Sequence, residues 1–164
     1  MATATVSTAD NTGAETSDTG PGLAIIDQRR RVYRDEFGFN TFRDPHTDAI
    51  TMVAGSVSAV ITTNTLGPQV RTLLGAGSVP VFSVGHRVWV FLTDPPTPTD
   101  NIAQLNVKLF THSAVPLFSG ALIVLPTPGN AKRCWLHLPD GYSRPSFAAV
   151  VDAVETAAAQ ADSQ

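Results

Sequence analysis

Hydrophobic positions recur along the chain first with a helical period and later with the pattern of strands. Over residues 23–37 the large side chains follow one another at spacings of three and four residues, which predicts one face of a helix. The residues of this face are Leu23, Ile26, Arg30, Tyr33 and Phe37. Gly38 follows directly and is a suitable residue to end the helix.

From residue 49 onward the pattern changes to short β-branched runs. Residues 49–53 and 57–62 predict two strands or one bent strand, because Ala-Gly-Ser separates them. A short helix with a cap at Asn64 or Thr65 is expected next, and it ends at the glycines of residues 75–77. The later expected elements are a hairpin of strands 79–82 and 87–92, a short helix at 101–109, a strand pair at 121–125 and 134–138, and a final helix capped by Ser146.

These elements predict an α+β fold. We expect a single compact domain over residues 23–160, with a mostly antiparallel sheet of five or six strands and two to four helices that cover one face. Residues 1–22 contain Val6 as the only large aliphatic side chain after Met1 and close with Pro21-Gly22. Such a segment buries too little apolar surface to offset the entropy of ordering it, so we expect a disordered tail.

Charge divides the chain at the same place. The formal net charge is −3, from 14 acids and 11 bases, and three of the acids lie in the expected tail, namely Asp10, Glu15 and Asp18. The remaining 11 acids and 11 bases cancel, so the tail is acidic and the expected domain is neutral. This balance argues against a protein that binds nucleic acid through its overall field.

The first helix is a local exception to this neutrality, because Arg29, Arg30, Arg31 and Arg34 fall within six residues. An arginine cluster on a helix predicts contact with phosphates or with a protein partner, and a solvated helix face is the alternative. Arg30 falls on the apolar face, so its stem is expected to lie over the core. The aromatic residues nearby are candidates for stacking on bases or for an exposed apolar patch; they are Tyr33, Phe37, Phe39 and Phe42.

Cysteine usage and hydropathy indicate the compartment. Cys134 is the only cysteine, so no intrachain disulfide can form, which fits a reducing environment. The chain shows neither the pattern of a signal peptide nor a run of about 20 apolar residues, so we expect a cytoplasmic protein that does not enter membranes. Cys134 lies in an apolar run, and His137 would fall on the opposite side of a strand, so we expect a buried structural cysteine.

Sequence motifs for catalysis are missing. The chain contains no GxSxG nucleophile turn, no GxGxxG or GxxxxGK[ST] phosphate loop, and no zinc spacing among its four histidines. The acid pairs Asp35-Glu36 and Asp44 with Asp48 do not follow an apolar strand that would hold them rigid. We therefore expect no metal, no cofactor and a module that binds or interacts. A small enzyme with an unrecognised type of site is the alternative.

The second half of the chain resembles a known family. Residues 79–92, followed by Pro95-Pro96, combine a glycine turn, a histidine and an aromatic strand. Residues 119–128 form an apolar run that ends in Pro-Thr-Pro, and residues 133–136 read Arg-Cys-Trp-Leu. In these segments the chain resembles, over about 60 of its 164 residues, the N-terminal domains of bifunctional DNA primase/polymerases of the archaeo-eukaryotic primase superfamily. Residues 138–141, Leu-Pro-Asp-Gly, and the expected C-terminal helix resemble small actinobacterial proteins that carry the same half-pattern. Gly85, His86 and Phe91 are the loose counterparts of that family's GG-x-H-x-x-F pattern, with a longer gap after the histidine.

The chain departs from this family where catalysis depends on metal ions. Active members carry two aspartates on an apolar strand, in the pattern hhhDhD, and no D-x-D occurs here. The resemblance therefore implies a degenerate, non-catalytic relative in which His86 is a relic or contacts a nucleotide or phosphate. We expect a module that contacts nucleic acid, a nucleotide or a protein partner, or that forms a homo-oligomer. The predicted contact residues are Arg29, Arg31, Arg34, His86, Arg87 and Arg133. The alternative is a regulatory protein–protein interaction domain unrelated to primases.

Overall fold

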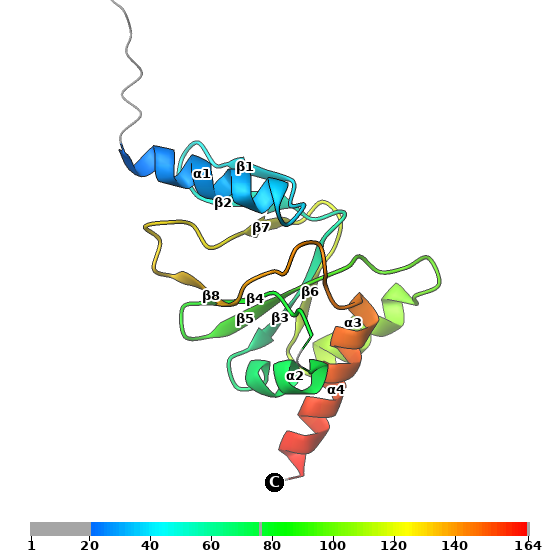
Figure 1. Ribbon diagram of the computed structural model, residues 1–164. Helices are drawn as coiled ribbons and strands as arrows, with labels where there is room; N and C mark the ends of the chain where they lie inside the picture. Colours follow the sequence, from blue (N-terminus) through cyan, green and yellow to red (C-terminus); the bar gives the residue numbers. More distant parts are fainter. Residues whose placement is uncertain (1–20, 76, 164) are drawn as a thin grey trace, which may run out of the picture.

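A five-stranded antiparallel sheet with both faces covered forms the middle layer of the molecule (Figure 1). The computed structural model describes residues 21–75 and 77–163, which form four helices and eight strands in two sheets. The strands are β1 (Thr41–Arg43), β2 (Ile50–Val53), β3 (Ser58–Thr63), β4 (Val81–Val84), β5 (Val88–Thr93), β6 (Val115–Leu117), β7 (Leu122–Val124) and β8 (Arg133–His137). The helices are α1 (Pro21–Asp35), α2 (Gly67–Leu74), α3 (Ile102–Thr111) and α4 (Phe147–Asp162).

The middle sheet has the strand order β6-β3-β5-β4-β8, and each of its strands pairs antiparallel with its neighbours. Successive side chains of a strand point to opposite faces, so each strand contributes to two cores. In β5, Phe91 packs on the side of the helices, whereas Val90 and Leu92 pack on the other side. This double burial explains why these strands read as nearly continuous apolar runs.

The upper layer consists of α1 and a second sheet of order β1-β2-β7 (Figure 1). Met52 of β2 pairs with Ile123 of β7, and both side chains are buried against the middle sheet. Tyr33 of α1 and Phe39, which follows the helix, belong to the same core. The upper sheet and α1 therefore cover one face of the middle sheet together.

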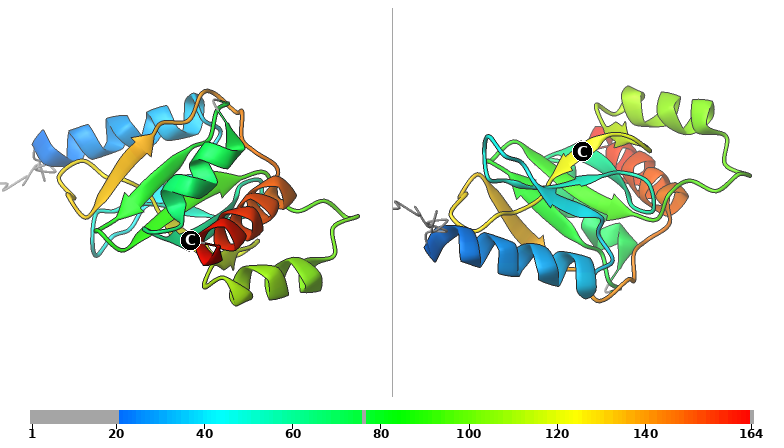
Figure 2. Two further views of the ribbon diagram at one scale, coloured as in Figure 1. Left: turned by 90° about the horizontal axis from the view of Figure 1, so that it is seen from below. Right: turned by 90° about the horizontal axis from the view of Figure 1, so that it is seen from above.

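The lower layer consists of α2 and α4, with α3 at the margin of the molecule (Figure 2). Ser146 caps α4, because its hydroxyl accepts a hydrogen bond of 3.2 Å from the backbone N–H of Ala149. Val150 and Val154 of α4 are fully buried against the middle sheet. A bond of 2.8 Å between Lys108 Nζ and Glu155 Oε2 links α3 to α4.

The structure confirms the predicted α+β class, the antiparallel pairing and the single compact domain. The hairpin of β4 and β5 and the Ser146 cap also lie where the sequence predicts them. In the described chain the strands number eight, above the expected five or six, because three short strands form the upper sheet. The prediction that the helices cover one face of the sheet is wrong for α1, which lies on the face opposite α2 and α4.

Strands form close to the predicted positions 121–125 and 134–138, but the prediction that they pair with each other is wrong. The strand β7 pairs with β2 in the upper sheet, and β8 pairs with β4 in the middle sheet. The connection between them is tied to the upper layer, since Ile50 N donates to Thr127 Oγ1 over 2.9 Å and Leu125 N donates to Ile50 O over 2.8 Å. The chain therefore changes layer between β7 and β8 instead of turning back on itself.

The tail predicted at residues 1–22 lies outside the described residues, except for residues 21 and 22. The helix α1 begins at Pro21, two residues before the predicted start of the domain. Within the described residues, no helix combines the length and the apolar character that crossing a membrane requires.

Candidate functional site

Tyr33 joins α1 to the segment that carries β8. Its hydroxyl donates a hydrogen bond of 2.6 Å to Pro126 O and accepts one of 2.7 Å from Trp135 Nε1. The ring of Trp135 meets the rings of Tyr33 and Phe82 edge to face, with centroids 6.0 and 5.4 Å apart. These contacts hold α1 and β8 as two rigid walls with a gap between them.

A groove of about 330 Å³ lies between these walls. Arg29 of α1 and Arg133 of β8 both line it, so one basic residue borders the groove on each side. The remaining lining residues are Tyr33, Pro126, Thr127, Pro128, Cys134 and Trp135. This described lining includes no Asp or Glu, so the positive charge of the two arginines has no carboxylate beside it in the groove.

The Tyr33 phenol is neutral at physiological pH. Burial raises its pKa above the usual value, although the Trp135 N–H and the nearby Arg29 charge oppose this shift. The hydroxyl is therefore present as O–H, which lets it donate to Pro126 O and accept from Trp135 at the same time.

Arg133 is only half-buried, and its Nε atom is shielded from solvent. Among the described residues this Nε has no hydrogen-bond partner. Arg133 lines the groove, and a guanidinium is suited to bind a bidentate oxyanion such as a phosphate.

The tip of the β4–β5 hairpin lies beside the start of β8. Gly85 N donates a hydrogen bond of 2.6 Å to Lys132 O, and Val84 pairs with Arg133 in the ladder. Gly85 has a φ of 57°, a conformation that glycine adopts without strain. The turn thus carries the exposed residues His86 and Arg87 to the same end of the sheet.

We call this region the basic end and define it by five residues, Arg29, His86, Arg87, Lys132 and Arg133. It combines three of the elements that bear the predicted contact residues: α1, the hairpin and β8. In the described chain, no salt bridge involves Arg29, Arg87, Lys132 or Arg133. No carboxylate of the described residues therefore neutralises these four charges.

A second groove lies on the opposite face of the sheet at the same end. Its lining combines Arg71 of α2 with Trp89 of β5, together with Pro68, Thr72 and Gly75. Trp89 and Trp135 lie on opposite faces, because Trp89 packs with the lower core and Trp135 with the upper core. Each face therefore offers one groove in which arginine and tryptophan side chains lie together.

The structure separates the arginines of α1. Arg31 is two positions from Arg29, so it projects about 200° away around the helix axis and does not reach the groove. Arg34 is bound to the carboxylate of Asp35, with 2.8 Å between Nε and Oδ1. Arg30 is half-buried and lies 3.5 Å from Asp27. Of the four arginines, Arg29 alone lines the groove with Arg133.

Two further interpretations of the sequence are corrected. Tyr33 and Phe39 are 1% and 0% exposed, so they cannot stack on bases or join an exposed apolar patch. Cys134 is exposed, not buried, because the alternation of β8 turns Trp135 toward the upper core and Cys134 outward. Arg71, Lys132 and the two tryptophans were not predicted as site residues, since only the packing of distant segments brings them to the two grooves and the basic end.

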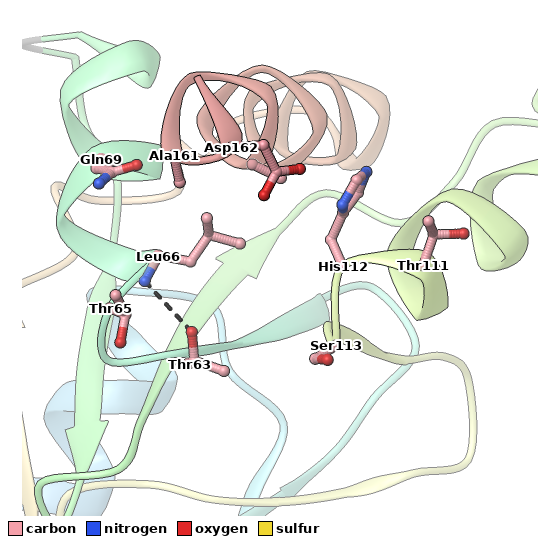
Figure 3. A pocket seen from close by; sticks show the side chains of 10 residues that line it. Thr63, Thr65, Leu66, Gln69, Thr111, His112, Ser113, Ala161 and Asp162 are labelled. Carbon is pink, nitrogen blue, oxygen red and sulfur yellow. Dashed lines mark hydrogen bonds between the residues drawn. The ribbon is translucent and has the colours of Figure 1, made fainter. Parts of the chain in front are cut away.

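A polar pocket of about 320 Å³ lies where α2 begins and where α3 and α4 end (Figure 3). His112, Ser113 and Asp162 line it, which raises the question of a nucleophile with a base and an acid. His112 points toward α4 and Asp162, whereas Ser113 lies on the other side of the backbone, below the ring (Figure 3). This arrangement does not align a serine hydroxyl with a histidine nitrogen as a nucleophile requires.

Metal-ligating side chains do not gather in the described chain, where no group of three His, Cys, Asp or Glu residues is placed to hold an ion. The acidic pairs of the sequence have local roles instead. Asp44 Oδ1 accepts hydrogen bonds from the backbone of His46 and Thr47, at 2.8 and 2.9 Å, and Asp48 lies 3.8 Å from Arg43. These carboxylates organise the turn between β1 and β2.

Comparisons with known proteins add no family to these observations: no family model matches the chain, and neither the curated proteins nor the solved structures contain a significant match.

Proposed function

We propose that this protein binds single-stranded nucleic acid through the basic end and acts as a non-catalytic, primase-like binding module. The observation that carries the proposal is the presence of an arginine–tryptophan groove on each face of the sheet beside one hairpin. Arg29, Arg133 and Trp135 line the first groove. Arg71 and Trp89 line the second.

The chemistry of the two grooves favours a single strand over a duplex. Arginine side chains neutralise phosphates, and partly exposed aromatic rings stack on bases. A duplex hides the faces of its bases, whereas a single strand presents them. Trp89 and Trp135 are both half-buried, so part of each ring is available for stacking while the rest is held by the core.

The neighbouring position of two segments also supports the primase-like part of the proposal. The glycine turn at Gly85 and the strand that begins at Arg133 both belong to the resemblance, and here they lie side by side through the Gly85–Lys132 hydrogen bond. In this proposal His86 and Arg87 contact the backbone of the strand from the tip of the hairpin.

Fluorescence anisotropy with a labelled oligothymidine at several salt concentrations tests this proposal. We expect affinity to fall with salt by about 0.7 in the log–log slope for each phosphate contact. The double variant Arg29→Ala/Arg133→Ala should lower the slope by about 1.4, because it removes two such contacts. The matched control is Arg31→Ala/Arg34→Ala, which removes the same charge outside the groove and should bind nearly as the wild type does. Equal losses in the two double variants, or no binding at low salt, would overturn the proposal.

The tryptophans provide an independent measurement, since the chain contains two and both line a groove. Stacked bases quench tryptophan emission, so the oligonucleotide should quench both the Trp89→Phe and the Trp135→Phe variants. Quenching in only one of them would restrict the site to one face of the sheet. A longer oligonucleotide that quenches neither would contradict stacking.

A further inference from the structure

One row of side chains on the lower face of the middle sheet connects the two grooves. In the strand ladder, Trp89 of β5 pairs with Ser83 of β4, and Ser83 pairs with Cys134 of β8. Directly paired side chains of an antiparallel sheet lie on the same face, and Trp89 packs with the lower core. Ser83 and Cys134 therefore lie on the lower face in line with Trp89, which lines the second groove.

The row ends at an open edge of the sheet. The strand β8 is the last in the order β6-β3-β5-β4-β8, so no described strand pairs with its outer side. Cys134 is exposed on this edge and also lines the first groove, which lies on the upper side. Seen from below, α2 crosses the middle of the sheet, and none of the described helices lies over β8 (Figure 2, left). The two grooves are thus the ends of one surface that passes around β8.

The side chains along this surface suit the passage of a polyanion. Ser83 is half-buried and Cys134 is exposed, and both are small, so the row has no bulky side chain between the grooves. The hydrogen bond between Gly85 N and Lys132 O brings the hairpin tip, with Arg87, to the start of β8. Arg87 and Lys132 are exposed, and neither takes part in a salt bridge within the described chain. Two bases therefore flank the row.

We infer, on the basis of the proposed function, that a single strand occupies both grooves at once by passing around the edge at β8, so that the ligand is an oligonucleotide and not a nucleotide. From Trp89 to β8 the path crosses two strand spacings, about 10 Å, and the turn to the other face of the sheet adds about as much. A stacked strand rises about 3.4 Å per nucleotide, so about six nucleotides link the grooves. With the bases that stack in each groove, a strand of about eight nucleotides fills the site.

Titration of the tryptophan emission with oligothymidines of about four, eight and twelve nucleotides tests this path. One eight-nucleotide strand per chain should quench both tryptophans. Its affinity should exceed that of the four-nucleotide strand at least about 10-fold, because only the longer strand reaches both grooves. Two oligonucleotides per chain, or an affinity that does not change with length, would overturn this inference alone. Failure of all lengths to bind would overturn the proposed function together with it.

A charge placed on the row tests where the strand passes. Ser83 lines neither groove, so Ser83→Glu adds a negative charge between them without altering either lining. This variant should bind the eight-nucleotide strand about 10-fold more weakly and the four-nucleotide strand within about two-fold of the wild type. The matched control is Ser119→Glu, the same change at an exposed serine beside Pro95 at the far end of the sheet, and it should bind both strands as the wild type does. Equal effects of the two variants would contradict the path.

Cys134 provides a second measurement that needs no substitution in the row. An eight-nucleotide strand with a thiol-reactive group on a central base should label Cys134 rapidly, because this residue lies between the grooves. The same group should react slowly from one of the two ends of the strand, namely the end that stacks on Trp89 two strands away. Cys134→Ser is the control and should not be labelled. Equal rates from the centre and from both ends would exclude the path even if the strand binds.

Discussion

Trp135 Nε1 donates a hydrogen bond of 2.7 Å to the hydroxyl of Tyr33, a residue 102 positions earlier in the chain. The same hydroxyl donates to Pro126 O, so one buried phenol satisfies an indole N–H and a backbone carbonyl. Both walls of the upper groove are therefore fixed by a single side chain. The spacing of Arg29 and Arg133 across that groove depends on this arrangement.

Replacing Tyr33 by Phe should destabilise the protein. The variant keeps the ring but leaves Pro126 O and Trp135 Nε1 without a partner, which costs about 1–3 kcal/mol in the free energy of unfolding. Urea denaturation followed by circular dichroism measures this change. The matched control is Tyr142→Phe, because Tyr142 is exposed and makes only a bond of 3.4 Å to Asp35 O. It should alter the free energy by less than about 0.5 kcal/mol.

The same phenol should make stability fall at alkaline pH. Burial raises the pKa of Tyr33 in the folded protein above its value in the unfolded chain, which is about 10. Below about pH 10 both states carry the proton, and above it the unfolded state loses the proton first. The stabilising contribution is therefore present below that pH and is lost as the pH rises through the folded pKa. Urea denaturation on both sides of pH 10 should show a steeper loss in the wild type than in Tyr33→Phe, and equal slopes would contradict this assignment.

Gly67 is expected to be sensitive to the addition of one methyl group. A Cβ at this position would lie 2.6 Å from Cδ2 of Trp89, so the indole must move. Gly67→Ala should lower the free energy of unfolding by about 1–3 kcal/mol, as overpacking does, and should change the emission of Trp89 in a Trp135→Phe background. Gly55→Ala is the control, since a Cβ there meets nothing within 4 Å. If both variants behave alike, Trp89 does not pack closely on α2.

Cys134 can report on the occupancy of the upper groove, because it is exposed and belongs to the lining. A thiol reagent such as Ellman's should label one cysteine per chain in the folded protein. Bound oligothymidine should slow this labelling several-fold, and it should not do so in Arg29→Ala/Arg133→Ala. Labelling that requires unfolding would contradict the exposure of Cys134.

The sequence predicts the elements that depend on neighbouring residues better than the pairings between strands that lie far apart in the chain. The Ser146 cap and the hairpin of β4 and β5 depend on residues close in sequence, and both are found as predicted. The pairing of β7 with β2 depends on strands that lie far apart in the chain, and no local pattern indicates it. A run such as Cys-Trp-Leu is apolar on both sides, so it cannot show that Trp135 faces the core and Cys134 the solvent.

The candidate site illustrates the same limit. Clustering in sequence singles out the arginines of α1, but the helical period sends Arg31 away from the groove and Asp35 engages Arg34. Arg71 stands alone in the sequence, yet the packing of α2 on the middle sheet brings it to Trp89. Nearness in space, and not in sequence, therefore selects the residues of the two grooves.

The position of β7 also has a consequence for the order in which the chain can fold. The upper sheet contains β1 and β2 from early in the chain but is complete only when β7 joins them, after all the strands of the middle sheet except β8. A chain emerging from the ribosome therefore holds an unfinished upper layer while β3, β4 and β5 are already available to pair. Closure of that layer and addition of β8 are late, long-range events. The upper groove, whose walls are α1 and β8, exists only after both have taken place.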